Sequence, residues 1–161
     1  MESFYPDKAF HMFDKLIKQP GFLFQINTTQ PERIYSRLDR YQDFTGRAFY
    51  YWKNGQGLYR TDIPNIYAPN TSNFINAIQH IYLSIHFGIY LFTDVGRALH
   101  DPLVIKIIEQ MHNKNDSQKK VLIFAQQELE LPTHIESYFT SIRHKVANSK
   151  MPSAQAMMAA G

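Results

Sequence analysis

The chain has 161 residues, 44% of them hydrophobic and 14% aromatic, with a formal net charge of +3; this is enough apolar material for one well-filled domain and excludes a disordered chain. It has no cysteine, which excludes disulfides, thiolate metal sites and cysteine nucleophiles. Neither a signal peptide nor an apolar run of membrane-spanning length is evident, so we expect a cytoplasmic protein that does not bind membranes.

The first third of the chain alternates between helix and strand patterns. Apolar residues recur at helical spacing in residues 6–18, which predicts an amphipathic N-terminal helix. The apolar run at residues 22–26 predicts a buried strand. Residues 29–32 have the form of a capping box with Pro31 in the first turn, and we expect a second helix to begin there.

The remaining two thirds continue this alternation, with a loop predicted from residue 54 to residue 70. Apolar residues at helical spacing predict helices at residues 73–85, 101–113 and 132–138. Apolar runs without alternation predict strands at residues 47–52, 88–94, 121–125 and 139–143.

Alternating helices and buried strands predict an α/β fold of three layers, with a mainly parallel sheet of about five strands covered by helices on both faces. We assign residues 1–146 to this single domain. Residues 147–161 lack apolar periodicity, and we interpret them as a linker or a truncated continuation.

The usual phosphate cradle of such a sheet is the loop after its first strand, here residues 27–32. A P-loop requires the pattern G-x-x-x-x-G-K-[ST], but no glycine of this chain is followed by lysine. Glu32 also places a negative charge where phosphate would lie. We therefore expect no nucleotide cofactor at this loop.

Other chemical motifs are weak. Gly55 and Gly57 resemble part of a dinucleotide fingerprint, but Arg60 replaces its third glycine, so we interpret them as turn residues with positive backbone angles. No histidine pair has the helical spacing of a zinc motif, and no G-x-S-x-G elbow is present. The sequence therefore predicts no metal site and no catalytic triad.

Asp94 follows an apolar strand, where a P-loop NTPase holds its magnesium-binding carboxylate. Without a phosphate cradle, Asp94 has two simpler roles: capping the turn at Gly96, or pairing with Arg97 or Arg33.

Three arginines, Arg33, Arg37 and Arg40, share one face of the second predicted helix. This ridge is either a solvated face paired with neighbours such as Asp43, or a surface for phosphate or an acidic protein. The strand that contains Trp52 loosely resembles the aromatic RNA-binding strand of an RRM, although core packing explains its aromatic residues equally well.

The order of these motifs resembles a known family. The resemblance rests on Thr28 followed by Arg33, Trp52 followed by Gly57, Asp94 closing its strand, and the segments 99–102, 121–124 and 131–136. It is to the N-terminal region of the AAA-type ATPases called the hypothetical chloroplast reading frame family, found in plastids, cyanobacteria and other bacteria.

The resemblance implies a RecA-like, degenerate P-loop core that has lost its Walker A loop and that precedes a complete AAA module. It also implies that Asp94 is the remnant of the Walker B carboxylate and that Gln126 is the remnant of a sensor residue. The sequence ends at Gly161 without an AAA module, so we expect either a fragment of a longer ATPase or a domain that works alone.

We therefore expect a non-catalytic interaction or regulatory domain with a protein partner, either its own AAA module or an equivalent one. Two alternatives stay open: a module that binds single-stranded nucleic acid through the arginine ridge and the aromatic strand, and a nucleotide-dependent enzyme with a site at Asp94. The candidate partner-facing residues are Thr28, Arg33, Arg37, Arg40, Trp52, Asp94 and Arg97.

Overall fold

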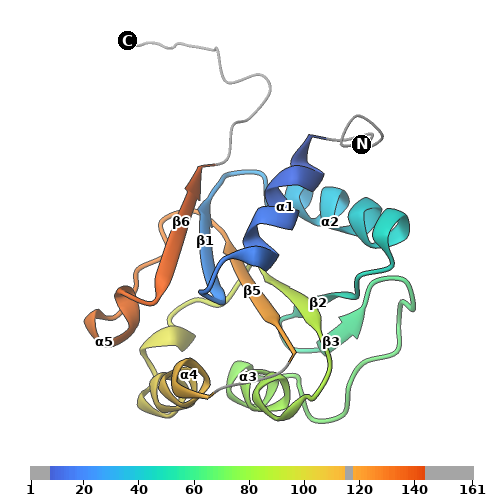
Figure 1. The fold of residues 1–161 in the computed structure, drawn as a ribbon. Coiled ribbons are helices and arrows are strands. Elements are labelled where there is room, and N and C mark those ends of the chain that lie inside the picture. Colours follow the sequence, from blue (N-terminus) through green and yellow to red (C-terminus); the bar gives the residue numbers. More distant parts are fainter. Residues whose placement is uncertain (1–7, 115–117, 144–161) are drawn as a thin grey trace.

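The computed structural model describes residues 8–114 and 118–143, which build a six-stranded sheet between two layers of helices (Figure 1). The strand order is β3-β2-β4-β5-β1-β6, and all neighbouring strands are parallel except β2 and β3. The predicted α/β class and mainly parallel sheet are therefore confirmed, with one strand more than expected. The parts of the predictions that concern residues 1–7 and 147–161 lie outside the described residues.

In chain order the elements are α1 (Ala9–Lys18), β1 (Leu23–Asn27), α2 (Pro31–Thr45), β2 (Phe49–Lys53), β3 (Gly57–Arg60), α3 (Phe74–Leu83), β4 (Gly88–Phe92), the 3-10 turn η2 (Ala98–His100), α4 (Pro102–Asn113), β5 (Lys120–Ala125), α5 (Thr133–Glu136) and β6 (Phe139–Arg143).

Each face of the sheet has its own apolar core. Helices α1 and α2 cover one face, where Phe24, Leu91 and Ile123 point toward them. Helices α3, α4 and α5 cover the other face, where Phe92 and Phe124 pack. Figure 1 shows these two layers above and below the sheet. Every residue of β4 and β5 is buried, which explains why both strands are continuous apolar runs.

The connections that follow β1 and β5 leave the sheet in opposite directions, although the two strands are parallel neighbours. Strand β1 continues into α2 on one face, whereas β5 continues into α5 on the other face. Adjacent parallel strands whose connections leave on opposite faces open a crevice at their carboxyl ends, and ligands of open α/β sheets bind at this switch point. The fold thus places residues after Asn27 and after Ala125 at the position where a site is expected.

The additional strand is β3, which lies in the segment predicted to be a loop. It pairs antiparallel with β2 through a tight turn in which Gly55 has φ 84° and Gly57 has φ 130°. A Cβ on Gly57 would lie 2.6 Å from Oγ1 of Thr71, so both conformation and space require glycine there. The predicted positive backbone angles are confirmed, but the loop prediction is wrong at residues 57–60 because the glycines turn a hairpin there.

Three of the predicted helices begin close to their expected positions. Asn73 caps α3 by accepting a hydrogen bond from the Asn76 amide, and Asp101 caps α4 in the same way from Leu103. The capping box at residues 29–32 is wrong: Gln30 is the N-cap of α2, without a side-chain cap, although Pro31 does occupy the first turn.

Candidate functional site

The carboxyl ends of the parallel strands meet at one edge of the sheet, which we call the rim. It consists of the loops after β1, β2, β4 and β5, at residues 28–30, 54–56, 93–97 and 126–132. Because this edge includes the switch point between β1 and β5, it is the candidate functional site of the fold.

The loop after β1 does not have the form of a phosphate cradle. It consists of three residues, 28–30, and none of them has a positive φ. Thr28 is buried, with 5% of its surface exposed, and its Oγ1 accepts a hydrogen bond of 3.0 Å from the amide of Gln30. A phosphate-binding loop needs several convergent N–H groups, but here Pro31 removes one and Thr28 occupies another.

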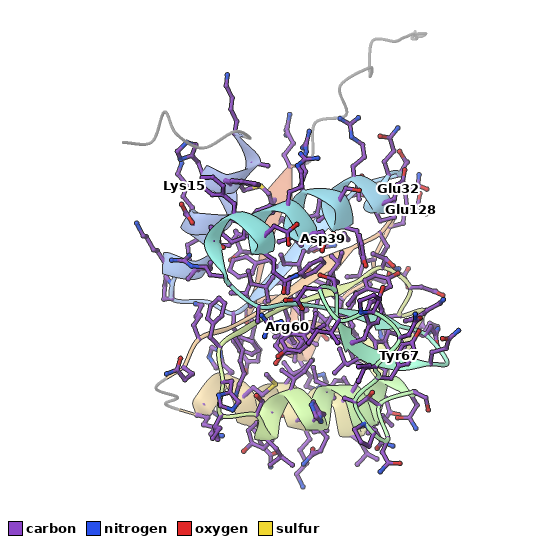
Figure 2. All side chains as sticks on the ribbon, turned by 90° about the vertical axis from the view of Figure 1, so that its right-hand side faces the viewer. Lys15, Glu32, Asp39, Arg60, Tyr67 and Glu128 are labelled. Carbon is purple, nitrogen blue, oxygen red and sulfur yellow. The ribbon has the colours of Figure 1, made fainter. Side chains whose placement is uncertain are left out.

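Carboxylates stand where a bound phosphate would be. Glu32 lies exposed in the first turn of α2, and Glu128 lies in the loop after β5, where its amide donates to Oδ1 of Asn27 at 3.3 Å. Figure 2 shows both side chains at the rim end of α2. Their charge favours a cation at this part of the rim and opposes an anion.

Asp94 is exposed just after the end of β4. Its carbonyl oxygen accepts a hydrogen bond of 3.2 Å from Nδ2 of Asn54. Its carboxylate makes no hydrogen bond or ion pair within residues 8–114 and 118–143, although Gly96 does turn the chain with φ 55°. The capping role predicted for the side chain is therefore not seen in the described chain.

Gln126 connects the ends of two neighbouring strands. Its Oε1 accepts a hydrogen bond of 3.2 Å from the amide of Val95, and its own amide donates to the carbonyl of Ile26. The residue that the family resemblance marks as a sensor remnant thus holds the loop containing Asp94 against β5 and β1. This is a positioning role, performed by an uncharged side chain.

The predicted partner for Asp94 is occupied elsewhere. Arg97 forms an ion pair of 3.1 Å with Glu130, and both side chains are largely exposed. Ion pairs of this kind contribute about 0–1 kcal/mol because water screens them. Arg97 therefore belongs to the solvated rim surface and is free to exchange Glu130 for another carboxylate.

The arginine ridge lies along α2, away from the buried stripe of that helix. Arg33 is half-buried and donates to Oε1 of Gln30 at 3.3 Å; Arg37 is half-buried and Arg40 is exposed. Arg33 thus lies beside the rim, whereas the other two follow the helix away from it. The structure does not gather the three arginines and Asp94 into one site.

Trp52 does not face a partner, contrary to its place among the predicted rim residues. It is 3% exposed, and its Nε1 donates a hydrogen bond of 2.8 Å to the carbonyl of Thr71. Its ring packs edge-on against Phe74 at 5.6 Å between centroids. The core-packing interpretation of this strand is the one that agrees with the structure, because an inward-facing ring at this β2 position fills the core.

A group of half-buried tyrosines beside the rim was missed by the sequence analysis. The rings of Tyr35 and Tyr51 meet edge to face, with centroids 5.1 Å apart. Tyr51 shares a hydrogen bond of 2.7 Å with Thr93, and Tyr35 shares one of 2.9 Å with Tyr59. Burial, together with the hydrogen bond shared with Tyr35, raises the pKa of Tyr59, so the Tyr59 phenol stays neutral.

These tyrosines border a pocket of about 270 Å³ that opens at the rim. We call it the tyrosine pocket; its lining residues are Pro31, Glu32, Tyr35, Tyr51 and Thr93. The only sequence signal for it was the position of Tyr35 one helical turn after Pro31, on the same side of α2. No motif connects that residue to β2.

Residues 8–114 and 118–143 contain no group of three or more side chains that could hold a metal ion and no helix long and apolar enough to cross a membrane.

A parallel sheet of this order, with its switch point between the first and fourth parallel strands, defines a RecA-like α/β domain. The profile of the SpoVK-like AAA ATPase N-terminal domain matches residues 11–144, and the chain belongs to this family. No curated protein and no solved structure matches the chain. The predicted AAA ATPase N-terminal region is confirmed, while the narrower resemblance to the hypothetical chloroplast reading frame family stays a prediction.

The exposure of Asp94 leads to a first prediction. We expect Asp94→Asn to change the free energy of unfolding by less than about 1 kcal/mol, because the carboxylate has no partner in the described chain to lose. We also expect no magnesium effect on the wild type. Thermal melts of both proteins with and without magnesium measure this, and stabilisation by magnesium of the wild type alone would contradict it.

Proposed function

We propose that this chain is a non-catalytic interaction domain that binds an AAA ATPase module through the rim and regulates it. The observation that carries the proposal is the family match over residues 11–144, combined with a loop after β1 that lacks a phosphate cradle. The resemblance to the chloroplast reading frame family adds that the module follows in the same polypeptide.

The rim supports binding of a protein more than catalysis on a nucleotide. A catalytic RecA-like site needs phosphate at the N-terminus of α2 and a magnesium-binding carboxylate at the end of β4. Here the negative charges of Glu32 and Glu128 oppose the binding of phosphate, so the Asp94 carboxylate lacks the phosphate with which it would share a magnesium ion. Exposed charges of both signs along the rim, from Arg97 and Lys53 to Glu130, are typical of a polar protein interface.

The aromatic strand gives little support to nucleic-acid binding. Single-stranded nucleic acids stack on aromatic rings exposed on an open sheet face. In this fold helices cover both faces, Phe49 and Trp52 of β2 are buried, and Tyr50 is stacked against Tyr90 at 4.9 Å. Binding through the arginine ridge would therefore lack its stacking platform.

A second prediction separates this proposal from a nucleotide-dependent enzyme. We expect millimolar ATP with magnesium to leave the melting temperature of the chain unchanged. A ligand at ten times its dissociation constant stabilises a protein by about 1.4 kcal/mol, or about 3–5 °C for a chain of this length. A reproducible rise of that size in a thermal melt would overturn the non-catalytic assignment; an isolated AAA module serves as the positive control.

The third prediction tests the partner. We expect the chain to bind an AAA module of a SpoVK-like ATPase in isothermal titration calorimetry and to change the rate of ATP hydrolysis by that module. Fluorescently labelled single-stranded DNA and RNA are the competing probes. Salt-dependent binding of these oligonucleotides, with no binding of the AAA module, would replace the proposal by the nucleic-acid alternative.

A further inference from the structure

The tyrosine pocket is the part of the rim where aromatic surface and negative charge meet. Two of its walls are the rings of Tyr35 and Tyr51, whose planes are 83° apart and therefore form a corner. The carboxylate of Glu32 and the ring of Pro31 complete the lining from the first turn of α2.

Hydrogen bonds hold both rings in place before any ligand arrives. The hydroxyl of Tyr51 is bonded to Oγ1 of Thr93 at 2.7 Å, which ties β2 to the end of β4. The hydroxyl of Tyr35 is bonded to that of Tyr59 at 2.9 Å, which ties α2 to β3. A binding surface whose side chains are already ordered loses less entropy when a ligand binds.

The pocket lining carries one carboxylate, that of Glu32. Among residues 8–114 and 118–143, Glu32 has no ion pair or side-chain hydrogen bond, and no basic residue lines the pocket. The neighbouring Arg33 directs a guanidinium nitrogen to Oε1 of Gln30. A corner of two aromatic rings beside a free carboxylate is the environment that attracts a cation, because ring faces and carboxylate both carry negative potential.

We propose that the tyrosine pocket receives an arginine side chain of the protein partner. The planar guanidinium stacks on a tyrosine ring and donates hydrogen bonds to Glu32, which fits an aromatic corner with a carboxylate at one side. The pocket volume of about 270 Å³ accommodates one such side chain. This inference rests on the proposed function and assigns to its rim one anchoring residue of the partner.

The first experiment uses a small probe and the intact chain. N-acetyl-arginine amide is titrated into the labelled protein, and backbone amide shifts are followed by NMR; N-acetyl-citrulline amide, neutral and of the same shape, is the matched probe. We expect saturable shifts at Glu32, Tyr35, Tyr51 and Thr93 with the arginine probe, with a dissociation constant in the roughly millimolar range. Citrulline amide should bind at least about threefold more weakly.

Two variants test the role of the carboxylate. Glu32→Gln should weaken binding of the arginine probe at least about threefold, because it removes the charge but keeps the shape of an exposed side chain. Glu136→Gln removes an exposed carboxylate from α5, outside both the rim and the pocket, and should leave binding unchanged. The NMR spectrum of each variant reports directly whether it remains folded.

Absence of saturable shifts, equal binding of the citrulline probe, or unchanged binding by Glu32→Gln would overturn the inference. Titration of the AAA module separates this result from the proposed function. If wild type and Glu32→Gln bind the module equally, the pocket assignment is wrong and the proposed function stands. If the arginine probe binds but the module does not, the proposed function is wrong and the pocket keeps its ligand.

Discussion

Phe92→Ala is expected to destabilise the protein by about 3–5 kcal/mol, the cost of deleting a large ring from a well-packed core. Phe92 is fully buried at the end of β4. Its ring stacks on Phe124 with centroids 4.9 Å apart and meets Phe74 edge to face at 5.3 Å. Alanine would leave a cavity between the sheet and α3, and β4 and β5 hold their neighbours too rigidly for the space to close.

The measurement is chemical denaturation of the wild type and the variant at 25 °C. The matched control is Leu103→Ala on α4, because Leu103 is 59% exposed and its removal should change the free energy of unfolding by no more than about 0.5 kcal/mol. A loss below about 1.5 kcal/mol for Phe92→Ala would show that the core is looser than the structure describes.

Gln42→Leu is expected to cost about 2–4 kcal/mol, although leucine is apolar and nearly the same size. Gln42 is 3% exposed and lies in a chain of buried hydrogen bonds. Its Oε1 accepts from the amide of Phe49 at 2.8 Å, and its Nε2 donates to Oγ1 of Thr61 at 2.7 Å, which in turn donates to Asp39. Leucine would leave the Phe49 amide buried without an acceptor.

The same substitution at an exposed position is the control. Gln56 accepts a hydrogen bond of 2.7 Å from the hydroxyl of Tyr67, but it lies at the surface, where water replaces a lost partner. Gln56→Leu should therefore change stability by less than about 0.5 kcal/mol. Hydrogen exchange of the Phe49 amide gives a second readout: protection should fall in Gln42→Leu and stay unchanged in the control, and equal protection in both would contradict the explanation.

The elements that the sequence predicted well are those with a local signal. The helix starts near Asn73 and Asp101 need only residues within one helical turn, and the buried strands around Leu91 and Ile123 need only their own apolar runs. Strand β3 was missed because its pairing with β2 depends on the contact of Gly57 with Thr71, fourteen positions away. Sequence spacing does not reveal that contact.

The sequence predicted where the rim lies, but not which side chains contact one another there. The ends of β1 and β4 follow from strand order, so Arg33 and Asp94 were assigned to the correct edge. The inward orientation of Trp52 and the pairing of Arg97 with Glu130 depend on sheet register and loop path. The tyrosine pocket joins α2, β2 and β4, three elements whose contact arises only in the folded sheet.

The position of β1 between β5 and β6 has a consequence for how this chain acquires its structure. Strand β1 lies between β5 and β6, so Leu23 is paired with Leu122 on one side and with Phe139 on the other. Each pairing closes a loop of about a hundred residues, and such distant contacts make folding slow. During synthesis β1 therefore waits on the order of ten seconds for both neighbours. Through that interval the side chains of Phe24 and Ile26, buried in the folded protein, are exposed apolar surface of an unpaired strand, and we expect this segment to be prone to aggregation until its neighbours pair with it.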